Sequence, residues 1–297
     1  MQIVKNSILV GLALLLGFGI TAQKKLDLNN PEHAVKAMRK VQSSLKDGEE
    51  IVYWWEGNVY SRIPGEKDRL LFTYQAMNIR ATKTLQDKER GYGFQMVSRE
   101  LLLYLDPKTG EVLDTWQNPF TGEEVKVIHV NNDPVNSRYP TFAKSSRGDY
   151  RFPGKVVGGT VFLNFEIPLF YTNPLGGDYQ EYVGGTYQAM EMFFFSVSEE
   201  ELCNAKKNTA DDVVINWARI SKWLPWMKMN DRVGQLIFSG SGKKLENWDK
   251  LPEILKKTIK EEYPIYVSAP SLDDQRPNQT SWTVFKEYID QKRSQKK

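Results

Sequence analysis

Hydrophobic and polar residues follow two different periods along the chain, and these periods separate a short helical start from a long β region. Between residues 31 and 45 apolar positions recur at helical spacing, and Asn30 before Pro31 is typical of a helix start. After Asp47-Gly48, runs of aromatic and branched residues bounded by Gly, Pro, Asp and Asn predict strands. We expect these strands at 51–63, 70–79, 92–105, 112–117, 124–130, 156–171, 179–197 and 233–239.

This order of elements predicts a mainly β (α+β) fold with one antiparallel sheet. Short links between the first five strands favour a meander, and the pairs Gly158-Gly159 and Gly184-Gly185 are typical of places where a sheet bends. We therefore expect a curved or closed barrel-like sheet with an N-terminal helix and two C-terminal helices, at 247–262 and 281–291. No segment has the composition of a flexible linker, which predicts a single domain over residues 23–297.

Two similar phrases, at 106–111 and 118–123, predict the register of the middle strands. Each combines Asp or Asn, Pro and Gly, so each predicts a tight turn, pairing Asp106 with Glu111 and Asn118 with Glu123. Side chains alternate between the two faces of a strand, so this pairing places five residues on one face, which we expect to be the interior. These residues are Arg99, Leu101, Trp116, Val125 and His129. Glu100 then points away, unless a bulge or a shift of one residue turns it inward.

The first 22 residues have the layout of a secretory signal peptide. Lys5 precedes an apolar run at 8–20, and Ala22 is the expected cleavage position. The alternative is a permanent anchor, but the run is shorter than the roughly 20 residues that cross a bilayer. We therefore expect an exported protein, periplasmic or secreted, with no membrane span after the signal is removed.

Composition excludes several classes of function. A net charge of +3 gives no electrostatic footprint for nucleic acid, and the single Cys203 cannot form an internal disulfide. His33 and His129 are far apart in the sequence, so we expect no metal site, and no nucleotide-binding motif predicts a cofactor. The sequence leaves the oligomeric state open.

A polar set on the aromatic strands supplies candidate chemistry. His129 is either a general acid or base, oriented by Asp133, or a structural histidine held by the backbone. Arg99 would hold an anionic ligand group, or serve as an internal partner for Glu100, Glu166 or Glu191. Glu191 lies among apolar residues and is either a catalytic acid or half of a buried ion pair, while Glu100 is a weaker candidate.

Aromatic residues are the other signal, with eight Trp, fourteen Tyr and fourteen Phe. They either pack the core or line a cavity for a flat, apolar or sugar-like ligand. The candidate ligand-binding residues are Trp54, Trp55, Trp116, Tyr171, Trp217, Trp223 and Trp226.

Several phrases, in their order, resemble one uncharacterised bacterial and fungal family, domain of unknown function 1838. They are Tyr53-Trp54-Trp55-Glu56-Gly57-Asn58-Val59-Tyr60, Ser98-Arg99-Glu100, Tyr104-Leu105-Asp106-Pro107, Asn118-Pro119-Phe120-Thr121-Gly122, His129-Val130-Asn131-Asn132-Asp133-Pro134-Val135, Trp223-Leu224-Pro225-Trp226-Met227 and Asn278-Gln279-Thr280-Ser281-Trp282. The resemblance covers nearly the whole mature chain. It implies an exported, mainly β, barrel-like protein, and it implies no activity or catalytic residues.

Three functions follow from these observations. The first is a binding module whose aromatic-lined cavity holds a small apolar or ring-shaped molecule. The second is a cofactor-independent isomerase, lyase or hydrolase that uses His129 as acid or base. The third is a structural or interaction role. Convergence of His129, Arg99 and one acid in a single pocket would favour the enzyme, whereas scattered positions would favour binding or structure.

Overall fold

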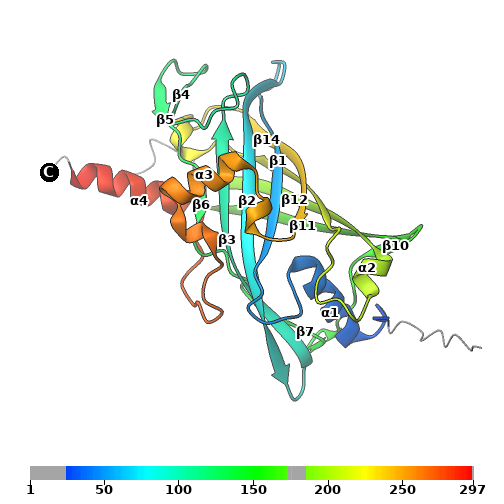
Figure 1. The fold of residues 1–297 in the computed structure, drawn as a ribbon. Helices are drawn as coiled ribbons and strands as arrows, with labels where there is room; N and C mark the ends of the chain where they lie inside the picture. The colour runs from blue at the N-terminus through cyan, green and yellow to red at the C-terminus, as the bar shows by residue number, and fades with distance from the viewer. Residues whose placement is uncertain (1–24, 173–174, 176–184, 296–297) are drawn as a thin grey trace, which may run out of the picture.

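One 10-stranded antiparallel sheet forms the body of the protein (Figure 1). The computed structural model describes residues 25–172, 175 and 185–295, so the signal peptide predicted at 1–22 lies outside the described residues. The strand order is β10-β11-β12-β13-β14-β1-β2-β3-β6, with β7 also paired to β3. Its longer strands are β1 (Ile51–Arg62), β2 (Arg69–Asp87), β3 (Gly91–Leu105), β11 (Thr160–Thr172), β12 (Thr186–Ser198), β13 (Val214–Ser221) and β14 (Gln235–Leu245).

Short elements complete the fold. The remaining strands of the main sheet are β6 (Val130–Asn132), β7 (Thr141–Phe142) and β10 (Lys155–Val157), and two small hairpins pair β4 (Thr115–Gln117) with β5 (Glu124–Lys126) and β8 (Lys144–Ser145) with β9 (Gly148–Asp149). The α-helices are α1 (Pro31–Gln42), α2 (Glu199–Cys203), α3 (Glu253–Glu262) and α4 (Ser281–Ser294). The 3₁₀ turns are η2 (Pro225–Met227), η3 (Trp248–Lys250) and η4 (Pro264–Val267).

The predicted fold class is confirmed. The sheet is curved, and no ladder joins its edge strands β10 and β6 within the described part of the chain. Helix α1 begins where the sequence predicts, because the Asn30 side chain accepts hydrogen bonds from the backbone amides of Glu32 and His33. Gly158-Gly159 forms the tight turn between β10 and β11 instead of a bend inside a strand; both glycines have positive φ.

A row of side chains across the sheet shows how it curves. On its concave face Trp217, Gly240, Gly57 and Tyr74 are successive cross-strand neighbours on β13, β14, β1 and β2. The two glycines leave space between the large residues, and the rings of Trp217 and Tyr74 meet edge to face over it at 5.8 Å. Figure 1 shows the outcome, with β11 and β12 crossing behind β1, β2 and β14 at a steep angle.

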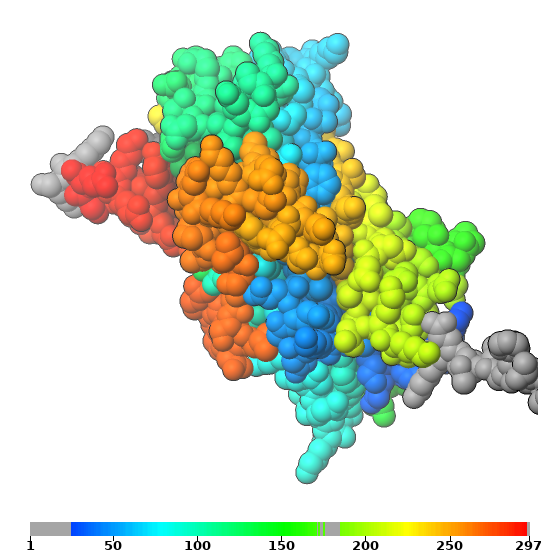
Figure 2. Space-filling model, in the orientation of Figure 1, coloured from blue at the N-terminus to red at the C-terminus, as the bar shows by residue number. Residues whose placement is uncertain are grey.

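Both faces of the sheet are buried. On the outer face α3 and η4 cover an apolar cluster that includes Met77, Leu101 and Leu103, with Leu255 and Tyr266 packed on top. Figure 2 shows this C-terminal segment, in orange, lying over the strands. The concave face holds the larger, aromatic core, and α1 packs at one end of it through Val35, Met38 and Val41.

Buried lysines fasten α1 to its neighbours. The Lys40 ammonium donates to three backbone carbonyls around α2, at 2.8 to 2.9 Å. The Lys244 ammonium, on β14, donates to the Lys40 carbonyl at 2.6 Å and the Thr209 hydroxyl at 3.0 Å. Burial lowers the pKa of Lys40 to about 8 and lowers that of Lys244 well below its usual value. The N–H groups of both lysines satisfy carbonyl groups that the ends of α1 and α2 leave unpaired.

The predicted pairing of the middle meander is confirmed close to its turns, where Leu105 pairs with Val112 and Trp116 pairs with Val125, but the predicted common face is wrong. Both turns form as expected, with Asp106 N–H donating to Glu111 O at 2.9 Å and Asn118 N–H donating to Glu123 O at 2.8 Å. However, β4 pairs only with β5, because β6 and β7 occupy the free edge of β3. Arg99 and Leu101 consequently lie on the outer face, and Glu100 lies on the concave face with Asn78 as its cross-strand neighbour.

The close approach at the glycines generates a stability prediction. A Cβ on Gly242 would lie 1.9 Å from the Trp54 carbonyl oxygen and 2.5 Å from Trp55 Cα, and this backbone cannot give way. We expect Gly242→Ala to lower the free energy of unfolding by about 1–3 kcal/mol in urea titrations. Gly185→Ala is the control, because nothing lies within 4 Å of the added methyl. Equal midpoints for both variants would show that the glycine is not required.

Candidate functional site

Charged side chains gather on the concave face, where most neighbours are aromatic. Glu100 comes from β3, Glu191 and Tyr187 from β12, and Arg219 from β13. Strands β3 and β12 are far apart in the strand order, so only the curvature of the sheet brings their side chains into electrostatic contact. We refer to these four residues as the interior cluster.

Arg219 links the members of this cluster. Its Nη1 lies 3.4 Å from the Glu191 carboxylate, its Nη2 donates to the Tyr187 hydroxyl, and its guanidinium lies 5.8 Å from the centre of the Phe238 ring. Burial alone would lower the pKa of Arg219, but Tyr187 and Glu191 raise it above its usual value. Arg219 therefore stays charged, and the ion pair remains partly accessible, with 14% and 21% of the two side chains exposed.

Glu100 has an unusual environment for a carboxyl group. It retains partial solvent access, and no side-chain or backbone group of the described residues donates a hydrogen bond to it. Burial, together with the charge of Glu191, raises its pKa to about 7, although Arg219 and Arg80 act in the opposite direction. A carboxyl of this kind exchanges its proton near neutral pH, as a general acid or base must.

Other polar atoms on the same face lack a partner. Arg219 Nε, the Tyr74 hydroxyl and Trp55 Nε1 are buried, and none has a hydrogen-bond partner among the described residues. A buried polar group without a partner costs about 1–3 kcal/mol. These buried polar groups lie on the concave face beside the rings of Trp217 and Tyr74.

The predicted aromatic ligand residues fall into separate groups. Trp55 and Trp217 contact each other over Gly242 and Gly240 on the concave face, with ring centres 6.3 Å apart. Trp116 and Trp226 pack with Phe72 and Tyr104 in one aromatic cluster of the core.

Trp223 contacts Phe120 with its ring tilted by 49°, and its indole N–H donates to the Arg232 carbonyl at 2.9 Å. Trp54 lies on the outer face beside α3. Tyr171 pairs with Tyr187 in the sheet register, but its side chain lies outside the described residues.

Arg99 and Asp133 form an ion pair outside the interior cluster. Arg99 Nε donates to Asp133 at 2.6 Å, and its Nη1 donates to the carbonyls of Ile265 and Ser268 at 2.9 and 2.6 Å. Arg276 also donates to Asp133, at 3.0 Å. Burial would raise the pKa of Asp133, but the two guanidinium groups lower it. Arg99 therefore ties η4 to β3 instead of pairing with Glu100, Glu166 or Glu191.

His129 is held by the backbone. Its Nδ1 accepts from the Tyr104 amide at 3.1 Å, and the ring also hydrogen-bonds the Leu113 backbone. Burial, with a smaller contribution from the Lys126 charge, lowers the pKa of His129 to about 4. Asp133 does not orient it, since both Asp133 oxygens accept from arginines. This arrangement favours the structural interpretation of His129.

Sequence reasoning missed Arg219, Tyr187 and Tyr74. The signal was present for Arg219, because Ile215, Trp217 and Arg219 alternate along one strand and so share a face. A cation at the end of such an apolar series indicates a buried ion pair or a ligand contact. No comparable pattern marks Tyr187, whose role depends on a neighbouring strand.

The fold and the site define a curved antiparallel-sheet protein with a charged cluster on its concave, aromatic face. The chain belongs to the family described as "Protein of unknown function (DUF1838)", whose model matches residues 48–289. No curated protein matches the chain. Within the described ranges, no helix is long and apolar enough to cross a membrane, and no group of three or more His, Cys, Asp or Glu side chains is arranged to hold a metal ion.

The depressed pKa of His129 predicts a pH dependence of stability. The unfolded chain takes up a proton near pH 6.5, whereas the folded chain does so only near pH 4, so stability falls as pH drops between these values. Between pH 7 and pH 4 we expect the free energy of unfolding of the native protein to fall by about 2–4 kcal/mol more than that of His129→Gln, measured by urea unfolding. His33→Gln, which alters the other histidine, is the control. Parallel losses in all three proteins would contradict the assignment.

Proposed function

We propose that the protein is exported and binds a small ring-bearing molecule on the concave face of its sheet. The observation that carries the binding proposal is a set of polar atoms on that face that have no hydrogen-bond partner among the described residues: Arg219 Nε, the Tyr74 hydroxyl and Trp55 Nε1. Small-molecule sites are usually lined by apolar and aromatic side chains together with a few polar groups. Export is supported by the signal-like pattern at 1–22.

The same atoms describe the ligand. Aromatic rings beside the glycines favour a flat or apolar body, which stacks against Trp217 or Tyr74. Arg219, Tyr74 and Trp55 supply hydrogen-bond donors, while Glu191 supplies an acceptor. A neutral ring that carries a carbonyl or hydroxyl group satisfies both requirements, because a strongly charged ligand would meet an ion pair that is already neutralised.

Extraction of the natively purified protein tests this proposal. We expect denaturation to release one low-mass ring compound in a defined ratio to protein, detected by mass spectrometry. Glu191→Gln should reduce that ratio about tenfold, since hydrogen bonds to charged groups contribute about 1.5–3 kcal/mol. Glu166→Gln, on an exposed position of neighbouring β11, should leave it unchanged. An empty native protein, or equal loss in both variants, would refute binding at the interior cluster.

A second candidate function is proton-transfer catalysis in the same place. It rests on Glu100, whose carboxyl is accessible, without hydrogen-bond donors among the described residues, and close enough to Glu191 for their charges to interact. In this version Glu100 takes the acid or base role that the sequence assigns to His129, and Arg219 stabilises developing negative charge on the substrate. The reaction class is an isomerisation, elimination or hydrolysis.

Protonation of Glu100 predicts a second pH dependence of the free energy of unfolding. Its pKa is near 4.5 in the unfolded chain and about 7 in the folded protein, so stability is fully present below pH 4.5 and declines as pH rises to 7. Glu100→Gln mimics the protonated form. We expect it to be more stable than the native protein by about 2–4 kcal/mol at pH 8, and equally stable at pH 4. Calorimetry measures the melting temperature of both proteins across this pH range. If the two melting temperatures change equally with pH, Glu100 is ionised in the folded protein and the prediction is wrong.

A further inference from the structure

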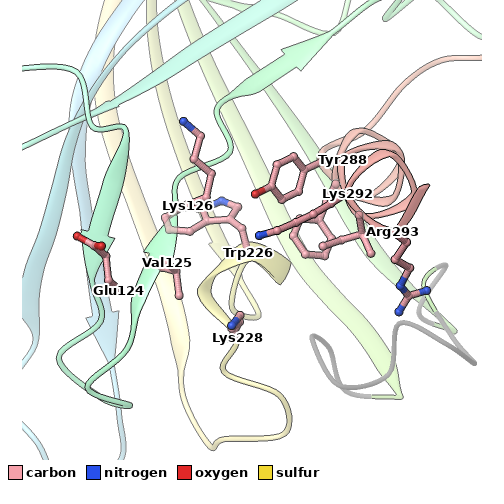
Figure 3. A pocket seen from close by; sticks show the side chains of 10 residues that line it. Glu124, Val125, Lys126, Trp226, Lys228, Tyr288, Lys292 and Arg293 are labelled. Carbon is pink, nitrogen blue, oxygen red and sulfur yellow. The ribbon is translucent and has the colours of Figure 1, made fainter. Parts of the chain in front are cut away.

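A separate pocket of about 370 Å³ opens between β5, η2 and α4 (Figure 3). Its residues come from three distant parts of the chain, and it does not include the interior cluster. The lining is Glu124, Val125, Lys126, Trp226, Lys228, Phe285, Tyr288, Ile289, Lys292 and Arg293. Four of these side chains are cationic, and one is acidic.

The floor of the pocket is apolar. Trp226 is only 4% exposed and packs against Trp116 and Phe72 of the core. Phe285 and Ile289 of α4 are buried beside it. A planar ring placed here would contact the indole without requiring the core to rearrange, because Trp226 is already held from behind by other rings.

The polar groups that reach over this floor are donors. Figure 3 shows the Lys292 ammonium, the Tyr288 hydroxyl and the Trp226 indole nitrogen pointing toward one another, with the Lys292 ammonium 5.7 Å from the centre of the Tyr288 ring. The Trp226 indole N–H, which can only donate, therefore lies beside a second donor and a hydroxyl group. A cation and two neutral O–H or N–H groups present no strong acceptor, so they complement an anion.

Two other cations at the rim, and the one acidic residue, are already engaged elsewhere. Lys126 pairs with Asp114, and Lys228 pairs with Glu123 at 3.0 Å. The acidic residue of the lining, Glu124, accepts a hydrogen bond from the Thr115 hydroxyl at 3.1 Å and points away from the pocket centre in Figure 3. Repulsion from Glu124 therefore does not oppose an anion at Lys292.

From this geometry we infer that the pocket binds a small organic monoanion, a planar ring that carries one carboxylate. The ring lies on Trp226 and the carboxylate meets Lys292 and Tyr288. The volume is at the small end of ligand pockets, which span about 300–1,000 Å³, so it accommodates one or two fused rings. The site is independent of the proposed function, because none of its residues belongs to the interior cluster.

Calorimetric titration with 1-naphthoate tests the inference, with the neutral 1-naphthamide as the matched ligand. We expect saturable binding of the carboxylate, at least tenfold weaker binding of the amide, and weaker carboxylate binding as salt is raised. Lys292→Gln should weaken 1-naphthoate binding about tenfold and Tyr288→Phe about threefold. Lys286→Gln, a lysine of the same helix outside the pocket, is the control.

The outcomes separate this site from the interior cluster. Unchanged affinity in Glu191→Gln together with the loss in Lys292→Gln supports the pocket. Loss in Glu191→Gln but not in Lys292→Gln would place the ligand in the interior and overturn the inference. Equal loss in Lys292→Gln and Lys286→Gln, or no saturable binding, would also overturn it without bearing on the interior ligand. Circular dichroism of each variant verifies folding.

Discussion

The curvature of the sheet at its paired glycines is the constraint on which the rest of the structure depends. Gly57 and Gly240 are direct cross-strand neighbours at the middle of the sheet, and Gly242, two residues further along β14, is the cross-strand neighbour of Trp55. Any side chain there would collide with the backbone of the adjacent strand. Their absence of side chains lets Trp217 and Tyr74 close over the gap, so that the far strands β12 and β13 face β3. Without this curvature Glu100 and Glu191 would belong to separate surfaces.

Much of the fold was predictable, because most of it depends on local chemistry. The Asn30 cap, the two Asp/Asn-Pro-Gly turns and the aromatic runs each act within a few residues. The strand faces were harder to predict. β3 carries Leu101 and Leu103 outward beneath α3, and Leu102 and Tyr104 inward, so both of its faces are apolar. Alternation shows which residues share a face, but it does not show which face is the interior when a helix covers the other.

The candidate site was predicted only in part, for a similar reason. Glu191 was identified from its apolar neighbours and does form an ion pair, but its partner is Arg219 on the next strand of the sheet, nearly 30 positions later in the chain. Arg99 and Asp133 do meet, yet they do so on the outer side where they fasten η4 to β3. A residue type indicates what chemistry is possible, whereas the partner depends on how distant strands are brought together.

The cations of this protein illustrate that distinction. Lys40 and Lys244 are buried against backbone carbonyls, so their N–H groups are used to hold α1 and α2 in place. Arg99 is used in the same way at η4. Arg219 differs, because one of its nitrogens has no partner in the described chain and its ion pair keeps some exposure. A cation whose hydrogen-bonding capacity is filled by carbonyls can only support the fold. A cation that keeps an open donor beside an acid and aromatic rings retains the capacity to bind a ligand. For this reason the interior cluster, and not His129, is the candidate functional site.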